Sequence, residues 1–236
     1  MKKSFLLLAI GTFTAWQIAA AADIIGVITL KGTPPAEVDI GPKMTEASPD
    51  CAALYPEGKL PTTHFYVVGK NGEFADVVVS LKDVSGKSTG ASAAPAELDQ
   101  KGCLYGPGIL AVQTGQKIIV KNSDPCLHNV HSISKAGNQD HNDAQMPGGA
   151  DLTYTFDKPE MFLKFQCDVH PWMFAWVSVF DSPYFSLSGA DGKFVIKNVP
   201  PGKYTIEAAH RKLGTQTAEV EVKDSDVTQN FTFEVK

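Results

Sequence analysis

Residues 165–173 read FQCDVHPWM, which places a thiol, an imidazole and a thioether at the spacing Cys-x-x-His-x-x-Met. The three side chains are Cys167, His170 and Met173, and their donor types suit a copper ion that changes between Cu(I) and Cu(II). A second histidine would complete such a site. His128 offers one upstream, in the stretch NSDPCLHNVH at residues 122–131.

The size and charge of the chain limit what it can be. It has 236 residues, of which 43% are hydrophobic and 20% charged, enough for one sizeable β domain or two small ones. The formal net charge is −5 and no long basic run occurs, so nucleic acid is not an expected partner.

The first 22 residues have the pattern of a bacterial signal peptide. Lys2 and Lys3 precede an apolar stretch over residues 5–18, and four alanines at residues 19–22 predict cleavage just before Asp23. A retained membrane anchor is the alternative. A lipoprotein is not expected, because no cysteine lies at the cleavage site. We therefore expect a periplasmic or secreted protein with no transmembrane segment after cleavage.

Export changes how the four cysteines are interpreted, because disulfides form in oxidising compartments. If Cys167 binds metal, the other three allow one bridge and one free thiol, and we favour Cys51–Cys103 as the bridge. Cys126 lies two residues before His128, so the two side chains share a face if the segment is extended. Cys126 is then a free thiol, an additional metal ligand or a disulfide partner, and the sequence leaves these three open.

The remainder of the chain predicts an all-β fold. Runs of β-branched and apolar residues predict strands over residues 24–30, 74–81, 109–112, 117–120, 152–156, 161–165 and 174–180. Residues 82–95 and 135–150 are polar and glycine-containing, which predicts a loop and a long connection. The tail from residue 184 predicts four more strands around the turns Asp191-Gly192 and Pro200-Pro201-Gly202. No long segment after the signal peptide has convincing helical periodicity, and a short helical turn is expected only near residues 52–54.

The predicted strands place the candidate ligands as a copper site needs them. Cys167 follows one strand, and His170 and Met173 precede the next, so one short loop supplies three ligands. His128 follows the strand over residues 117–120 and supplies the fourth from a neighbouring strand end. A trigonal arrangement of two imidazoles and a thiolate, with a weak axial methionine, is the geometry of a blue-copper site.

These two motifs, in this order and separation, resemble those of the cupredoxins, and amicyanin- and plastocyanin-type members most closely. The resemblance covers residues 98–181 and implies a Greek-key β-sandwich that binds one copper ion. It implies imidazole ligands at His128 and His170, the thiolate at Cys167 and an axial sulfur at Met173. Asn129 would join the two ligand-bearing loops by hydrogen bonds from outside the ligand shell.

The resemblance also implies how electrons reach the copper. His170 is expected near the surface, where Pro171 and Trp172 form an apolar rim on which a redox partner docks. Cys126 departs from the family pattern, since a second thiolate close to the first ligand would change the properties of the site.

The rest of the chain resembles a carboxypeptidase-regulatory-like β module, as found in exported proteins of which some are linked to methylamine utilisation. We expect a cupredoxin domain at residues 95–181, inserted into one discontinuous module formed by residues 23–94 and 182–236. In the alternative, residues 23–94 elaborate the cupredoxin and residues 182–236 form a separate small β-sandwich.

The expected function is electron transfer and not catalysis, because protein donors fill every ligand position and leave none open for a substrate. The partner would be a redox protein, either a dehydrogenase or a cytochrome. Two other functions stay open: a periplasmic copper carrier or store, and a structural envelope protein with a vestigial metal loop. A zinc hydrolase is the least favoured, since methionine is a poor zinc ligand.

Overall fold

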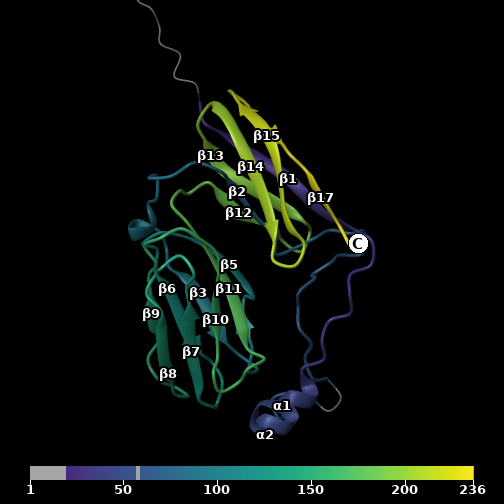
Figure 1. Cartoon of the computed structure of the whole chain (residues 1–236), viewed down its shortest axis with the longest axis vertical. Coiled ribbons are helices and arrows are strands. Elements are labelled where there is room, and N and C mark those ends of the chain that lie inside the picture. The colour runs from purple at the N-terminus through teal and green to yellow at the C-terminus, as the bar shows by residue number, and fades with distance from the viewer. Residues whose placement is uncertain (1–19, 57–58, 236) are drawn as a thin grey trace, which may run out of the picture.

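The computed structural model describes residues 20–56 and 59–235. Within these residues the chain forms two β-sandwiches, which Figure 1 shows one above the other. The predicted all-β class, with a Greek-key sandwich and a second β-sandwich, is confirmed. The predicted signal peptide at residues 1–22 falls almost entirely on residues 1–19, which lie outside the described residues.

The first sandwich is built from residues 96–180 and consists of two sheets with the orders β5-β11-β10-β7-β8 and β4-β3-β6-β9. The chain crosses repeatedly between the sheets, so that β3 pairs with β6 and β5 with β11 in parallel, while the other pairs are antiparallel. The strands are β3 (Ala96–Gln100), β4 (Tyr105–Gly106), β5 (Ile109–Gln113), β6 (Ile118–Asn122), β7 (His128–Ile133), β8 (His141–Gln145), β9 (Leu152–Tyr154), β10 (Glu160–Gln166) and β11 (Phe174–Phe180).

The second sandwich combines strands from both ends of the described chain. In one sheet β1 pairs with β13, β16 and β17, and the other sheet has the order β12-β2-β14-β15. In sequence, the whole first sandwich lies between β2 and β12. The strands are β1 (Ala22–Lys31), β2 (Val78–Leu81), β12 (Phe185–Leu187), β13 (Lys193–Val199), β14 (Gly202–His210), β15 (Gly214–Val222), β16 (Val227–Thr228) and β17 (Phe231–Glu234).

Each sandwich has its own apolar core, because alternate side chains of a strand point to opposite faces of the sheet. In β1 the inward residues include Ile24 and Ile28, and in β10 they are Leu163 and Phe165, all essentially inaccessible to solvent. Full burial of such a side chain contributes about 1.5–3 kcal/mol. The two cores hold the strands in register and thereby fix the strand ends.

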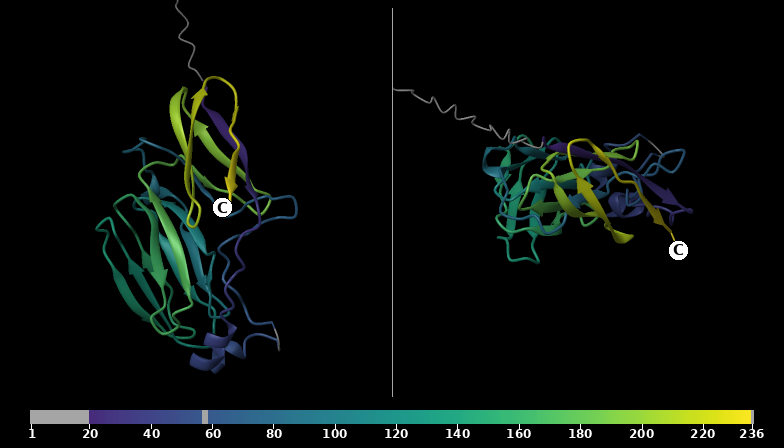
Figure 2. Two further views of the ribbon diagram at one scale, coloured as in Figure 1. Left: turned by 45° about the vertical axis from the view of Figure 1, so that its right-hand side comes forward. Right: turned by 90° about the horizontal axis from the view of Figure 1, so that it is seen from above.

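The segment between β1 and β2 leaves the second sandwich and packs against the first. It forms two short helices, α1 (Gly41–Ala47) and α2 (Pro49–Ala52), each with a proline in its first turn. Met44 and Cys51 of these helices are fully buried in the core of the first sandwich. We call residues 41–52 the cap; Figure 2 shows it at one end of that sandwich. Neither these helices nor any other in the described residues is long and apolar enough to cross a membrane.

Two predicted boundaries were wrong. Residues 135–150 are not one long connection, because they contain β8, whose sequence HNDAQ shows no apolar alternation. This strand pairs only with β7 at the edge of its sheet, where polar side chains reach solvent. In addition, β2 begins at Val78 and not at Phe74, and the residues before it form turns and isolated bridges.

The hairpin between β14 and β15 touches the first sandwich and carries a buried histidine. The guanidinium of Arg211 lies 3.5 Å from the ring centroid of Trp176 in β11. Next to it, His210 donates a hydrogen bond from Nε2 to the Phe65 carbonyl (3.0 Å), and its ring centroid lies 4.5 Å from that of Phe74. Burial lowers the pKa of His210 to about 4.

We predict that this histidine makes the fold less stable in acid. An unfolded histidine takes up a proton near its ordinary pKa of 6.5, whereas folded His210 stays neutral down to about pH 4. The free energy of unfolding should therefore fall by up to about 3 kcal/mol between pH 7 and pH 4. Urea denaturation at several pH values measures this. His210→Phe should lose this dependence and His64→Phe, at an exposed site, should keep it; equal slopes in both variants contradict the prediction.

Candidate metal centre

Three of the predicted ligands meet where strand β7 begins and strand β10 ends. These strands are antiparallel neighbours, with His131 opposite Gln166, so the start of β7 lies beside the loop that follows β10. His128 is the first residue of β7, and Cys167 and His170 lie in that loop. Residues 42 positions apart in the chain, His128 and His170, thereby come into direct contact.

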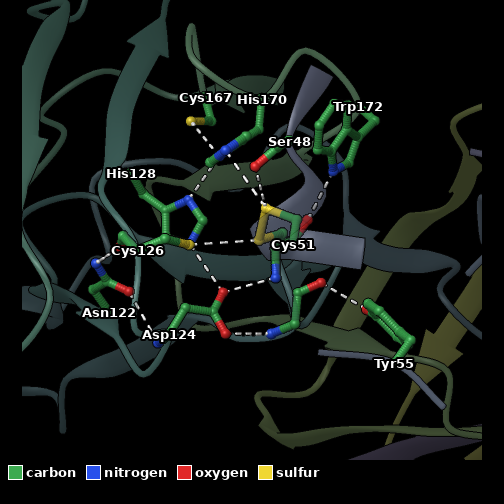
Figure 3. Close-up of a disulfide and its surroundings, with 12 residues drawn as sticks. Ser48, Cys51, Tyr55, Asn122, Asp124, Cys126, His128, Cys167, His170 and Trp172 are labelled. Carbon is green, nitrogen blue, oxygen red and sulfur yellow. Dashed lines mark hydrogen bonds and ion pairs between the residues drawn. A yellow bond between two sulfur atoms is a disulfide. The ribbon is translucent and has the colours of Figure 1, made fainter. Parts of the chain in front are cut away.

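The distances between the donor atoms fit a single metal ion. The Nδ1 atoms of His128 and His170 lie 3.0 Å apart, and Cys167 Sγ lies 3.7 Å from Nδ1 of His170. All three residues are buried, and their donor atoms lie within 4.8 Å of one another. An ion can therefore sit about 2.0–2.3 Å from each donor, the length of metal–imidazole and metal–thiolate bonds. Figure 3 shows the three side chains together.

Met173 closes the ligand loop. Its N–H donates to the His170 carbonyl (2.8 Å), and its own carbonyl accepts from the Cys167 N–H (3.2 Å). The side chain is fully buried and belongs to the same apolar core as Cys167. Met173 is thus held in the loop that carries the thiolate, as an axial ligand would have to be.

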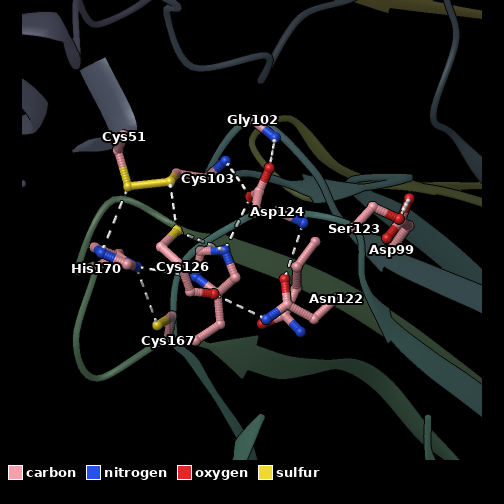
Figure 4. A network of polar contacts seen from close by, with 12 residues as sticks. Cys51, Asp99, Gly102, Cys103, Asn122, Ser123, Asp124, Cys126, Cys167 and His170 are labelled. Atoms are coloured by element: carbon pink, nitrogen blue, oxygen red, sulfur yellow. Dashed lines mark hydrogen bonds and ion pairs between the residues drawn. A yellow bond between two sulfur atoms is a disulfide. The ribbon is translucent and has the colours of Figure 1, made fainter. Parts of the chain in front are cut away.

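Asp124 orients His128, a role that the sequence analysis did not assign. Oδ2 of the carboxylate lies 2.9 Å from Nε2 of His128, which donates the bond and leaves Nδ1 free for a metal. The carboxylate also accepts the N–H groups of Gly102 (2.6 Å) and Cys103 (2.7 Å), as Figure 4 shows. Burial alone would raise the pKa of Asp124, but the hydrogen bonds from His128, Cys103 and Gly102 lower it, so the carboxylate is charged.

Asn129 connects the two ligand-bearing segments. Its N–H points to Cys167 Sγ at 3.3 Å, and its Oδ1 accepts the N–H of Asp168 (3.1 Å). The hydroxyl of Tyr105 donates to the Asn129 carbonyl (3.0 Å) from the opposite sheet. These contacts hold the sulfur in place before any metal binds.

The environment of Cys167 favours its thiolate. Burial alone would raise the pKa of this thiol, but its contacts with the imidazoles of His128 and His170 and the hydrogen bond from the Asn129 N–H outweigh burial and lower the pKa to about 6. At neutral pH most of the sulfur is therefore in the form that binds metals.

A disulfide covers the outer side of the centre. It joins Cys51 of the cap to Cys103, the pairing favoured from the sequence. Cys51 Sγ lies 3.5 Å from Nε2 of His170, and His170 is only 4% exposed. The expectation that His170 lies near the surface was wrong, because the cap occupies the position from which a partner would approach. Trp172 is buried as well, 5% exposed, so it forms no apolar docking rim.

The fourth cysteine, Cys126, is a free thiol beside the centre. Its Sγ lies 3.7 Å from Nε2 of His128 and 3.6 Å from Sγ of Cys103. Burial and the nearby charge of Asp124 raise its pKa. Cys126 thus lies on the Nε2 side of the His128 ring, whereas Nδ1 faces His170.

Comparison with protein families gives one match, confined to the second sandwich. Residues 185–235 match the model of the second beta sandwich domain of BOS complex subunit NOMO1-like proteins. A comparison with characterised proteins finds no match for the chain.

Solved structures similar to parts of the chain include those of three copper proteins. A purple cupredoxin from Nitrosopumilus maritimus is 23% identical (TM-score 0.31) over 36% of this chain and 98% of that one. An amicyanin mutant in its Cu(I) form is 20% identical (TM-score 0.33) over 43% of this chain and 97% of that one. A copper-containing nitrite reductase from Thermus scotoductus SA-01 is 20% identical (TM-score 0.34) over 38% of this chain, which spans only 23% of the reductase. These likenesses are partial, so the case for a metal centre rests on its own side chains.

We predict that Asp124→Asn weakens metal binding. Removal of the charge that orients His128 should lower the affinity by about tenfold or more, as for other groups that hold a metal-binding histidine. Competition against a chelator of known affinity measures the change, with circular dichroism to verify folding. Asp151→Asn, at an exposed site, is the matched control. Equal affinities in the two variants contradict an orienting role for Asp124.

We also predict that metal-free protein forms a thiolate near pH 6. The ultraviolet absorbance of the thiolate should rise with a midpoint at about 6, and Cys167→Ser should abolish that step while Cys126→Ser retains it. The folded pKa lies below the ordinary value of 9.0, so ionisation of Cys167 stabilises the fold fully above pH 9 and this contribution disappears as the pH falls through 6. A first thiolate that forms only near pH 9 contradicts the prediction.

Proposed function

We propose that this protein binds one copper ion through His128, Cys167, His170 and Met173, and that the ion carries single electrons. The observation that supports this is the convergence of two buried imidazole nitrogens and a thiolate of lowered pKa. Two imidazoles, one thiolate and a weak thioether form the ligand set of a blue-copper site. When bound, the ion would supply one-electron oxidation and reduction.

The surrounding residues serve electron transfer better than catalysis. Asp124 orients one imidazole, the Asn129 N–H bonds to the sulfur, and all of the ligands are buried. Ligands that are held before the metal binds move little when its charge changes. Four protein donors leave no open position for a substrate, so the proposed function is not enzymatic.

Copper carriage is a second candidate, and Cys126 is the observation that favours it. A free thiol 3.7 Å from His128 Nε2 could capture Cu(I) and pass it to or from the centre. Transfer of copper to a chelating partner, faster than electron exchange, would distinguish this function from the first.

We further propose an exported protein with two domains. The pairing of β1 and β2 with strands of residues 185–234 supports a carboxypeptidase-regulatory-like β module into which the copper domain is inserted. The N-terminal sequence supports a periplasmic or secreted location. The partner would be a redox protein that approaches by a route other than the edge of His170, because the cap covers that edge.

We predict that the copper-loaded protein absorbs intensely in the visible range through thiolate-to-copper charge transfer. Cys167→Ala should abolish this band, because it removes the only sulfur proposed in the trigonal plane. Met173→Leu should keep the band and shift the reduction potential, since a weak axial ligand tunes the potential. Met146→Leu, at a site that is 60% exposed, is the matched control and should change neither.

Two results would contradict the copper proposal. One is a colourless protein with one equivalent of Cu(II) demonstrably bound. The other is a band that persists in Cys167→Ala. A band that is lost in Cys167→Ala, together with an unchanged potential in Met173→Leu, would keep the three-ligand centre and exclude Met173 from it.

A further inference from the structure

Three of the four cysteines form a sulfur cluster on the outer side of the metal centre. Cys51 and Cys103 are bridged, and Sγ of the free thiol Cys126 lies 3.6 Å from Sγ of Cys103. Figure 4 shows the three sulfurs together above His170. The proposed copper function uses none of these atoms as a ligand.

Cys103 and Cys126 belong to the same rigid frame. Asp124 accepts the N–H of Cys103 (2.7 Å) and lies two residues before Cys126. The side chain of Asn122 donates to the Cys126 carbonyl (3.0 Å). A bridge between Cys103 and Cys126 would require the sulfurs to approach by about 1.5 Å to reach bonding distance. Cys51, by contrast, lies on the cap, a separate segment of the chain.

The surroundings of Cys51 suit its sulfur to be the leaving group in a thiol–disulfide exchange. Ser48 Oγ donates a hydrogen bond to Cys51 Sγ (3.2 Å), although the Ser48 side chain makes no capping bond to helix α2. Nε2 of His170 lies 3.5 Å from the same sulfur. When Nδ1 of His170 holds a metal, its proton must lie on Nε2, which then also donates to Cys51. Hydrogen bonds to a leaving thiolate favour its departure.

We propose that Cys126 exchanges with the Cys51–Cys103 disulfide and thereby releases the cap from the metal centre. The sulfur of Cys126 attacks Sγ of Cys103 and loses its proton to solvent. The Cys103–Cys126 bond forms, the Cys51–Cys103 bond breaks, and Cys51 leaves as a thiolate that takes up a proton. One disulfide and one thiol are present before and after, so no external oxidant or reductant takes part.

The consequence is a metal centre that can be opened. In the bridged form Cys51 holds α2 against Nε2 of His170. After exchange the cap is retained by apolar contacts, such as those of Met44, and by the Tyr55 hydroxyl just beyond it, which donates to the Gly102 carbonyl (2.6 Å). The edge of His170 can then become accessible to a partner. The Cys51–Cys103 bridge is the form that the structure contains, and exchange should take minutes to hours, as uncatalysed rearrangements do.

Disulfide mapping of the full chain tests the exchange. The protein is incubated with iodoacetamide for several hours, quenched in acid and digested without reduction, and the peptides are identified by mass spectrometry. We expect a product alkylated at Cys51 with a Cys103–Cys126 bridge, which Cys126→Ser must lack. In addition, Cys51→Ser should form the Cys103–Cys126 bridge within the monomer when oxidised in air.

The results that overturn the exchange are equally definite. They are alkylation of wild-type protein at Cys126 with no labelling of Cys51 above the Cys126→Ser background, or failure of Cys51→Ser to form the Cys103–Cys126 bridge. Both readings are independent of copper, so a failed copper proposal leaves this test intact, and a failed exchange leaves the copper proposal intact.

A kinetic comparison tests whether the hydrogen bond from Ser48 speeds the departure of Cys51, or whether the closeness of Cys126 to Cys103 alone accounts for the exchange. Ser48→Ala removes the hydroxyl donor to Cys51 and should slow labelling of Cys51 about fivefold, the effect of one lost hydrogen bond of ordinary strength. Ser85→Ala, at an exposed loop position, is the matched control and should label at the wild-type rate. Equal rates in the two variants overturn the role of Ser48 in the departure of Cys51.

Discussion

The buried carboxylate of Asp124 is the interaction on which the arrangement of the centre depends. It is 6% exposed and accepts three hydrogen bonds, from His128 Nε2 and from the N–H groups of Gly102 and Cys103. A buried charge without such partners would cost several kcal/mol. The need to compensate the carboxylate charge therefore holds all three donors in place. One side chain thereby sets the tautomer of a ligand and positions the loop that anchors the disulfide.

Local patterns made part of this structure predictable. The Cys-x-x-His-x-x-Met loop and His128 could be found because a strand–loop–strand unit and a neighbouring strand end determine their relative positions. The strands in alternating or apolar segments, such as Ile24–Leu30, could be predicted for the same reason. Strand β8 could not, because an edge strand needs no apolar face and its residues HNDAQ provide none.

The cover over His170 was not predictable from the ligand loop. It comes from Cys51, 119 positions away in the chain, on helices too short to show amphipathic periodicity. The role of Asp124 was equally hidden, since its sequence context, Asp-Pro, indicates only a turn. Both features are tertiary. The cover arises because the cap packs on the first sandwich, and the role of Asp124 arises because the segments that carry Gly102, Cys103 and His128 meet around its carboxylate.

The pairing of strand β1 affects how the chain folds during its synthesis. Its register joins Ile28 to Phe231 and Leu30 to Phe233, close to the end of the described chain. During synthesis β1 must therefore wait for partners that follow residues 96–180 in the chain, whereas the nine strands of residues 96–180 can already close around their own core. During that interval β1 exposes unpaired backbone and the apolar side chains of Ile24 and Ile28, the state in which edge strands aggregate. Strand β1 therefore depends on residues 227–234 for its protection.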